Sequence, residues 1–164
     1  MDNETLEREL RLLQQASFAW AMACSDYRRE EAEDLLQTVY LKIIDGRARF
    51  DGKSSFKTWL FAVIRLTARE RYRSALRERR GLTLWSSRHV PFLADPSAGD
   101  ASHIRAALRG LSRRQREVLE LVFYHELSIE ESAAVMGIGA GSARTHYERG
   151  KSNLRRSLGI AVQS

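Results

Sequence analysis

Apolar residues recur at helical spacing along most of this 164-residue chain. The pattern is clearest over residues 32–44, where the apolar positions are Ala32, Leu35, Leu36, Val39, Tyr40, Ile43 and Ile44. Steps of three and four residues place them on one face of a helix, which Gly46 ends. A looser apolar stripe predicts a helix from about Thr5 to Ser25, and a long pattern predicts another from Phe56 to about Arg80.

Two short motifs mark helix starts in the second half of the chain. Ser112-x-x-Gln115 and Ser128-x-x-Glu131 match the capping box, in which side chains satisfy otherwise unpaired amides at a helix N-terminus. They predict helices over residues 113–124 and 129–136. A third helix is expected over residues 141–158, after a glycine-containing turn.

Residues 81–103 contain both prolines and lose the helical period, which predicts a linker. Trp85, Phe92 and Leu93 within it are apolar enough either to dock on a surface or to collapse locally. Strand signals are nearly absent. We therefore expect an all-α fold of two small helical domains, residues 1–80 and 104–164, joined by a flexible linker.

Charge is distributed unevenly along the chain, although the formal net charge is only +6. Residues 1–46 carry 5 Lys/Arg against 10 Asp/Glu, residues 47–92 carry 12 against 3, and residues 93–164 carry 10 against 8. An acidic block followed by a basic one predicts two surfaces, one for a protein partner and one for phosphates.

A single cysteine, Cys24, excludes an intramolecular disulfide and a cysteine-based zinc cluster. It is interpreted as a small core thiol, with a redox role as the alternative. The chain has no apolar run of about 18 residues, and its acidic N-terminus does not resemble a signal peptide. We expect no membrane insertion and a cytoplasmic location.

The segment from Ser128 onward has the layout of a helix-turn-helix: a short capped helix, a turn at Gly137 and a longer helix. The outer face of the longer helix combines side chains that read base edges with side chains that bind phosphates. These are Ser142, Arg144, Thr145, His146, Arg149 and Lys151. The alternative is an ordinary helical hairpin with a solvated charged face.

Between Lys53 and Arg80, aromatic residues alternate with cations, a composition that suits single-stranded nucleic acid because bases stack on rings while arginines hold phosphates. Aromatics at helical spacing also fit a core, and Trp59 could be wholly structural. Catalysis is not supported, because the four histidines are scattered and there is no glycine-rich phosphate loop. We expect no catalytic residue, no metal site and no cofactor.

Five segments of the sequence, in two groups, carry a family resemblance. Residues 32–37 (AEDLLQ) and 50–60 (FDGKSSFKTWL) resemble the second conserved domain of extracytoplasmic-function sigma factors of bacterial RNA polymerase. Residues 111–119 (LSRRQREVL), 127–133 (LSIEESA) and 136–138 (MGI) resemble the fourth. Both groups of segments occur in the family's order, although Leu66 stands where members commonly have an asparagine.

The resemblance implies a division of labour between the two domains. The helix over residues 32–44 would bind the core polymerase through Asp34, Leu35, Gln37, Thr38 and Leu41. The basic stretch would capture the non-template strand of the minus-10 element through Lys53, Phe56, Lys57, Trp59, Arg65 and Arg69. The helix-turn-helix would read the minus-35 element, and a separate anti-sigma protein would control the factor.

Three other functions stay open from the sequence. A helix-turn-helix regulator acting without polymerase would usually dimerise and bind a palindrome. A nucleic-acid-modifying enzyme would turn over substrate without polymerase. A basic structural coat would bind without sequence preference and with a steep salt dependence.

Overall fold

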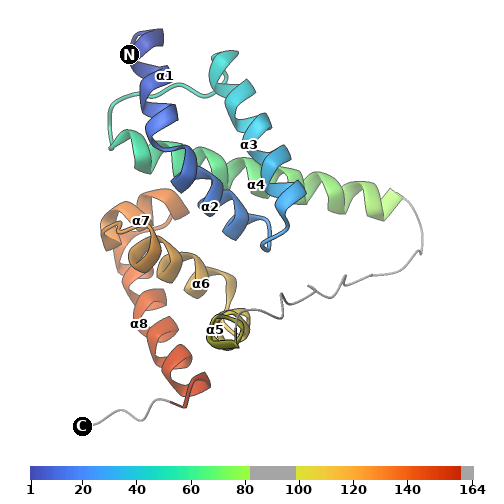
Figure 1. The fold of residues 1–164 in the computed structure, drawn as a ribbon, viewed down its shortest axis with the longest axis vertical. Helices are drawn as coiled ribbons and strands as arrows, with labels where there is room; N and C mark the ends of the chain where they lie inside the picture. Colours follow the sequence, from blue (N-terminus) through green and yellow to red (C-terminus); the bar gives the residue numbers. More distant parts are fainter. Residues whose placement is uncertain (82–98, 160–164) are drawn as a thin grey trace.

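The computed structural model describes residues 1–81 and 99–159, and every described element is helical (Figure 1). In order these are α1 (Asn3–Leu12), α2 (Gln14–Cys24), α3 (Arg29–Ile44), α4 (Phe56–Gly81), α5 (Gly99–Arg109), α6 (Arg113–Leu119), the π-helical turn η1 (Glu120–Tyr124), α7 (Ile129–Met136) and α8 (Ala140–Ser157). The all-α prediction is confirmed. Helices α1–α4 form an amino-terminal unit and α5–α8 a carboxyl-terminal unit.

The amino-terminal unit is built around α4, on which α2 and α3 pack. Trp20 of α2 and Phe61 of α4 are fully buried and stack with ring centroids 5.8 Å apart. The Trp20 indole N–H donates to the Phe61 carbonyl at 3.1 Å, so the largest core side chain has no unpaired polar atom. Leu35 and Leu60 complete the centre of this core.

The predicted helix from Thr5 to Ser25 is divided into two at Leu13, whose ψ of 5° departs from helical geometry. Helix α1 has no buried residue, whereas α2 buries Ser17, Trp20 and Ala21. The break allows α2 to follow the core while α1 lies at the edge.

Helix α3 confirms the predicted apolar face with one correction. Leu35, Val39 and Ile43 are buried, but Ile44 is 75% exposed. The two neighbours Ile43 and Ile44 are about 100° apart around the helix, so only one of them can face the core at this end.

The carboxyl-terminal unit confirms the predicted helix starts. Ser128 and Glu131 form the complete capping box. Ser112 caps α6, but the amide oxygen of Gln115 accepts from Asn153 of α8, so this side chain helps α8 pack on α6. Gly137 ends α7 with φ of 65°, a left-handed conformation that glycine adopts without steric cost.

Two features of this unit differ from the predictions. The helix expected over residues 113–124 changes from α to π geometry at Glu120. Helix α5 begins at Gly99, inside the predicted linker. Trp85, Phe92 and Leu93 lie outside the described residues.

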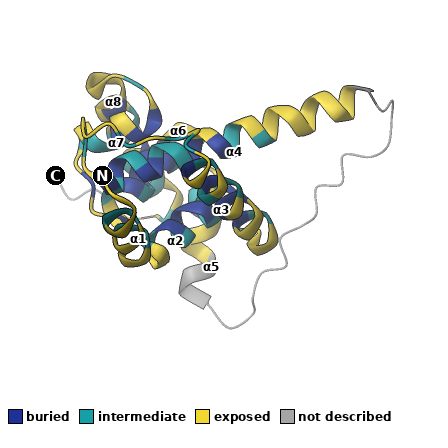
Figure 2. Cartoon of the chain, turned by 90° about the horizontal axis from the view of Figure 1, so that it is seen from above, coloured by how far each residue is buried: buried dark blue, intermediate teal, exposed yellow. Residues whose placement is uncertain are grey.

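The two units share one hydrophobic core, although the sequence predicts two. Val118, Leu121 and Met136 of the carboxyl-terminal unit belong to the same buried cluster as Trp20 and Phe61. The contact runs mainly between α4 and α7. The far end of α4 projects away from both units and is exposed (Figure 2).

Candidate nucleic-acid interface

The outer face of α8 is open to solvent. Ser142, Arg144, Thr145 and Arg149 are all exposed, while Ala143 on the opposite side is buried against the unit. The Arg144 guanidinium lies 3.3 Å from Glu130 of α7, an exposed pair of low stability that can reopen. Four of the six residues predicted on this helix therefore lie together on one accessible surface.

His146 and Lys151 are less accessible than those four residues. Lys151 lies over the ring of Tyr147, with its ammonium 4.4 Å from the ring centroid, and pairs with Glu148 at 3.2 Å. His146 is half-buried. Both lie at the edge of the exposed face, and Lys151 is held in place by its neighbours.

The two predicted aromatic residues at the start of α4 form a packed cluster with Phe50 of the preceding loop. Phe50, Phe56 and Trp59 have ring centroids 5.2 to 5.5 Å apart, in tilted and edge-to-face arrangements. Phe56 is buried, whereas Trp59 is half-buried. Phe56 therefore supports the loop that precedes α4, and of the two predicted rings Trp59 is the accessible one.

The cations predicted for the minus-10 site, in the loop before α4 and on α4 itself, differ in their surroundings. Lys53 is exposed and pairs with Asp51 at 3.3 Å. Arg69 is half-buried, and the nearby positive charge of Arg65 lowers the pKa of its guanidinium. These two residues are available to a phosphate backbone.

Lys57 and Arg65 instead contact the carboxyl-terminal unit. The Lys57 ammonium donates to the His125 carbonyl oxygen at 2.7 Å. Arg65 is only 7% exposed and forms two parallel hydrogen bonds with the Glu117 carboxylate, of 3.1 and 3.0 Å. Its third nitrogen donates to the Met136 carbonyl oxygen at 3.0 Å.

The predicted protein-binding residues of α3 lie on one face with a single exception. Asp34, Gln37 and Leu41 are exposed, and the Thr38 hydroxyl accepts from Arg71 at 3.2 Å. Leu35 is 1% exposed and belongs to the core, so it cannot contact a partner from this position.

Ile44 extends the exposed face of α3 by one helical turn beyond Leu41. Leu41 and Ile44 are 55% and 75% exposed and form a small apolar patch at this end of α3. Ile44 is absent from the predicted contact residues because its spacing also fits the buried face.

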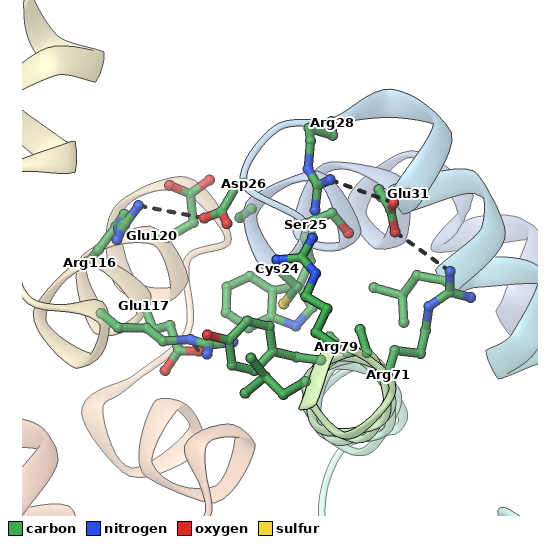
Figure 3. Close-up of a pocket in the computed structure, with 18 residues that line it drawn as sticks. Cys24, Ser25, Asp26, Arg28, Glu31, Arg71, Arg79, Arg116, Glu117 and Glu120 are labelled. Carbon is green, nitrogen blue, oxygen red and sulfur yellow. Dashed lines mark ion pairs between the residues drawn. The ribbon is translucent and has the colours of Figure 1, made fainter. Parts of the chain in front are cut away.

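A cavity of about 640 Å³ lies where α2, α4 and α6 meet (Figure 3). Its wall carries ion pairs of Arg28 with Glu31 at 3.6 Å and of Arg116 with Asp26 at 3.9 Å. Cys24 lines it, and burial raises the pKa of this thiol well above its usual range. A thiol that stays protonated is a weak nucleophile, which favours the core interpretation of Cys24 over the redox one.

His125 lies in the contact between the amino-terminal and carboxyl-terminal units, and it was not among the residues predicted from the sequence. Its ring lies edge-on to Phe61 and Trp20, at centroid distances of 4.8 and 5.8 Å, and is 3% exposed. Burial, together with the charge of Lys57, lowers its pKa to about 4. The imidazole is therefore neutral at physiological pH, and its Nε2 has no hydrogen-bond partner.

Within residues 1–81 and 99–159, no three histidine, cysteine or acidic side chains come together as metal ligands. Over the same part of the chain, no helix is long and apolar enough to cross a membrane.

Two protein-family models match the chain, one in each unit. Sigma-70 region 2 matches residues 7–78, and Sigma-70 region 4 matches residues 103–154. Together they contain the exposed face of α3, the basic face of α4 and the face of α8.

Several curated relatives are similar to the chain over most of their length. The RNA polymerase sigma factor CarQ of Myxococcus xanthus is 36% identical, over 78% of this chain and 75% of the relative. The ECF RNA polymerase sigma factor SigX of Bacillus subtilis is 32% identical, over 79% and 72%.

Solved structures agree with these relatives. The sigma factor RpoE of Bartonella quintana, in complex with the anti-sigma factor NepR, matches with a TM-score of 0.77 and 26% identity, over 96% of this chain and 98% of that one. CnrH in complex with the cytosolic domain of CnrY shares the fold, with a TM-score of 0.60 and 21% identity over 91% and 86% of the chains. The two matching family regions, together with the similarity to CarQ and SigX, show that the chain belongs to the family of extracytoplasmic-function RNA polymerase sigma factors.

Proposed function

We propose that this chain binds core RNA polymerase, directs it to specific promoters and helps to open them, without catalytic chemistry of its own. Residues 1–80 act as the polymerase-binding and minus-10 domain, and residues 104–164 as the minus-35 domain, on either side of the linker. The observation that supports the proposal is one chain with cationic side chains on two helices, α4 and α8, and an exposed apolar pair, Leu41 and Ile44, on a third helix.

Helix α8 is proposed to read the minus-35 element as duplex DNA. Its exposed face presents Ser142, Thr145 and two arginines, a set that can contact both base edges and phosphates from the major groove. His146 and Lys151 border this face. Gly137 sets the turn that lets α7 lie across the backbone while α8 enters the groove.

The start of α4 and the loop before it are proposed to capture the separated minus-10 strand. Trp59 of α4 offers a half-buried ring for a base. Lys53 in the preceding loop and Arg69 further along α4 are the cations proposed to hold phosphates. Lys57 and Arg65 also lie on α4. Separating a base pair costs about 1.4 kcal/mol per step. Stacking a captured base on a ring returns about 1–3 kcal/mol. Capturing one or two bases would offset much of the cost of opening.

The exposed face of α3 is proposed to bind the polymerase through Asp34, Gln37, Thr38, Leu41 and Ile44. Leu35 contributes only by holding the helix on its core. Regulation by an anti-sigma protein is proposed because the sigma factor RpoE of the similar structure is itself bound to one. Such a factor acts in the cytoplasm, where the polymerase is.

Equilibrium DNA binding with and without sigma-free core polymerase tests this function. We expect weak binding of promoter duplex by the chain alone and tight, sequence-specific binding once core polymerase is added. Tight binding of a palindromic duplex by a dimer of the isolated chain would contradict the proposal and favour a conventional regulator.

A further inference from the structure

We propose that the cavity between α2, α4 and α6 binds a free nucleotide, with arginines of its wall on the phosphates and the ring of Tyr72 against the base. Among the described residues that line this cavity, none is proposed above to contact promoter DNA. The inference goes beyond the proposed function, because it assigns a small ligand to a sigma factor whose proposed partners are DNA and proteins.

The cavity has the size and wall of a small-molecule site. Its volume of about 640 Å³ lies within the range of roughly 300–1,000 Å³ that is usual for such sites. Trp20 and Leu35, which are both buried, and Ala68 and Ala75 of α4 give it an apolar part. Charged side chains supply the remainder of the wall, so an organic anion fits it better than a wholly apolar ligand.

Positive charge is in excess around the cavity. Its wall contains five arginines, which are Arg28, Arg71, Arg79, Arg113 and Arg116. It contains four carboxylates, which are Asp26, Glu31, Glu117 and Glu120. Glu117 already forms two hydrogen bonds with Arg65, a cation outside the wall, at 3.1 and 3.0 Å. Five cations therefore face three other carboxylates, and burial raises the pKa of one of these, the Glu120 carboxyl.

The arginines of the wall are loosely paired. Arg28, Arg71, Arg113 and Arg116 form ion pairs at N–O distances of 3.6 to 3.9 Å. These distances exceed the roughly 2.7–3.2 Å of an N–H···O hydrogen bond. Arg79 forms no ion pair with any residue that the structure describes. Most of these guanidinium N–H groups are therefore available to a phosphate, which arginine binds through two parallel hydrogen bonds.

The arginines reach the cavity from separate elements. Arg28 precedes α3, Arg79 lies near the end of α4 and Arg116 lies on α6, and all three line the same space (Figure 3). Cations on several sides can hold more than one phosphate oxygen at once. This arrangement favours a diphosphate over a single carboxylate.

Tyr72 gives the cavity an aromatic surface. It is 57% exposed, and its ring centroid lies 6.0 Å from the Arg113 guanidinium carbon. Leu76, one helical turn further along α4, is 37% exposed and also lines the cavity. Nucleic-acid bases stack on exposed rings of this kind. A ring beside phosphate-binding arginines is what a nucleotide requires, whereas inorganic phosphate would use the arginines alone.

Isothermal titration calorimetry of the full chain with ADP and with GDP tests the site at physiological salt, which weakens contacts with exposed charges. Pyrophosphate and adenosine are the separate arms, since one carries only phosphates and the other only a ring and a sugar. We expect one nucleotide per chain and about tenfold weaker binding of either part alone. The bound nucleotide should also raise the melting temperature, because it binds the folded state.

Arg79→Gln removes a cation of the wall that has no ion pair to lose, and it should weaken nucleotide binding about tenfold. Arg77→Gln is the matched control, because it removes an exposed arginine of the same helix that does not line the cavity. It should leave the affinity unchanged. Tyr72→Leu keeps an apolar side chain without the ring, and it should reduce nucleotide affinity to that of pyrophosphate.

The proposal is overturned if neither nucleotide binds. It is also overturned if Arg77→Gln weakens binding as much as Arg79→Gln, because the overall charge of the chain would then explain the affinity. Pyrophosphate binding as tight as that of the nucleotides would refute a site for the base. Neither polymerase nor promoter enters these titrations, so their outcome is independent of the test of the proposed function.

Discussion

Acid is expected to destabilise the folded chain through His125. This imidazole is 3% exposed between Trp20 and Phe61, faces the ring of Tyr124, and has the Lys57 ammonium as its charged neighbour. Burial and that charge lower its pKa from 6.5 to about 4. A proton therefore binds the unfolded chain more tightly than the folded one.

The sign and size of the effect follow from linkage. Above pH 6.5 both states are neutral at His125 and the residue contributes no pH dependence. As the pH falls below 6.5, stability is lost at up to about 1.4 kcal/mol per unit, and the loss is complete near pH 4. Between pH 7.5 and 5 the expected loss is about 2 kcal/mol.

Urea unfolding at several pH values measures this loss, and His125→Phe isolates it. The variant keeps an aromatic ring in the site but cannot titrate, so the difference between wild type and variant should grow as the pH falls from 6.5 toward 4. Carboxylates also titrate in this range but do so in both proteins. A difference that is flat with pH would refute the assignment of a depressed pKa to His125.

Three further predictions concern packing, capping and partner binding. Gly150→Val should lower stability by about 1–3 kcal/mol in thermal unfolding, because a Cβ at this position would lie 3.1 Å from the Leu119 side chain. A variant as stable as the wild type would contradict the close packing of α8 on α6. Ser128→Ala should cost about 1 kcal/mol by removing the α7 cap, and an unchanged melting curve would argue against it. Ile44→Glu should weaken core polymerase binding about tenfold with little change in stability. Leu12→Glu, at a site of similar exposure on α1, should leave binding unchanged. Equal effects of the two substitutions on binding would contradict a polymerase contact on α3.

Local features of the fold could be predicted from the sequence because their causes are local. The capping box of Ser128 and Glu131 and the left-handed turn at Gly137 depend on neighbouring residues alone, and both are present. The break at Leu13 could not be predicted, because apolar residues continue through it and the core decides which part of the stripe is buried.

The candidate site was only partly predictable for a related reason. The exposed face of α8 follows from helical spacing, because the unit buries one side of that helix. Arg65 was predicted at a nucleic-acid surface, yet its partner Glu117 lies 52 residues away in sequence. Spacing shows which residues share a face, but it does not show which other part of the chain covers that face.

Run-off transcription with sigma-free core polymerase tests the central claim most directly. Templates carrying a library of promoters are transcribed with the wild-type chain, with Arg144→Ala, and with Arg11→Ala as a control that removes an exposed arginine from α1. The account predicts specific transcripts that depend on the chain, fade with Arg144→Ala and persist with Arg11→Ala. No chain-dependent transcript from any promoter, together with no binding to core polymerase, would contradict it.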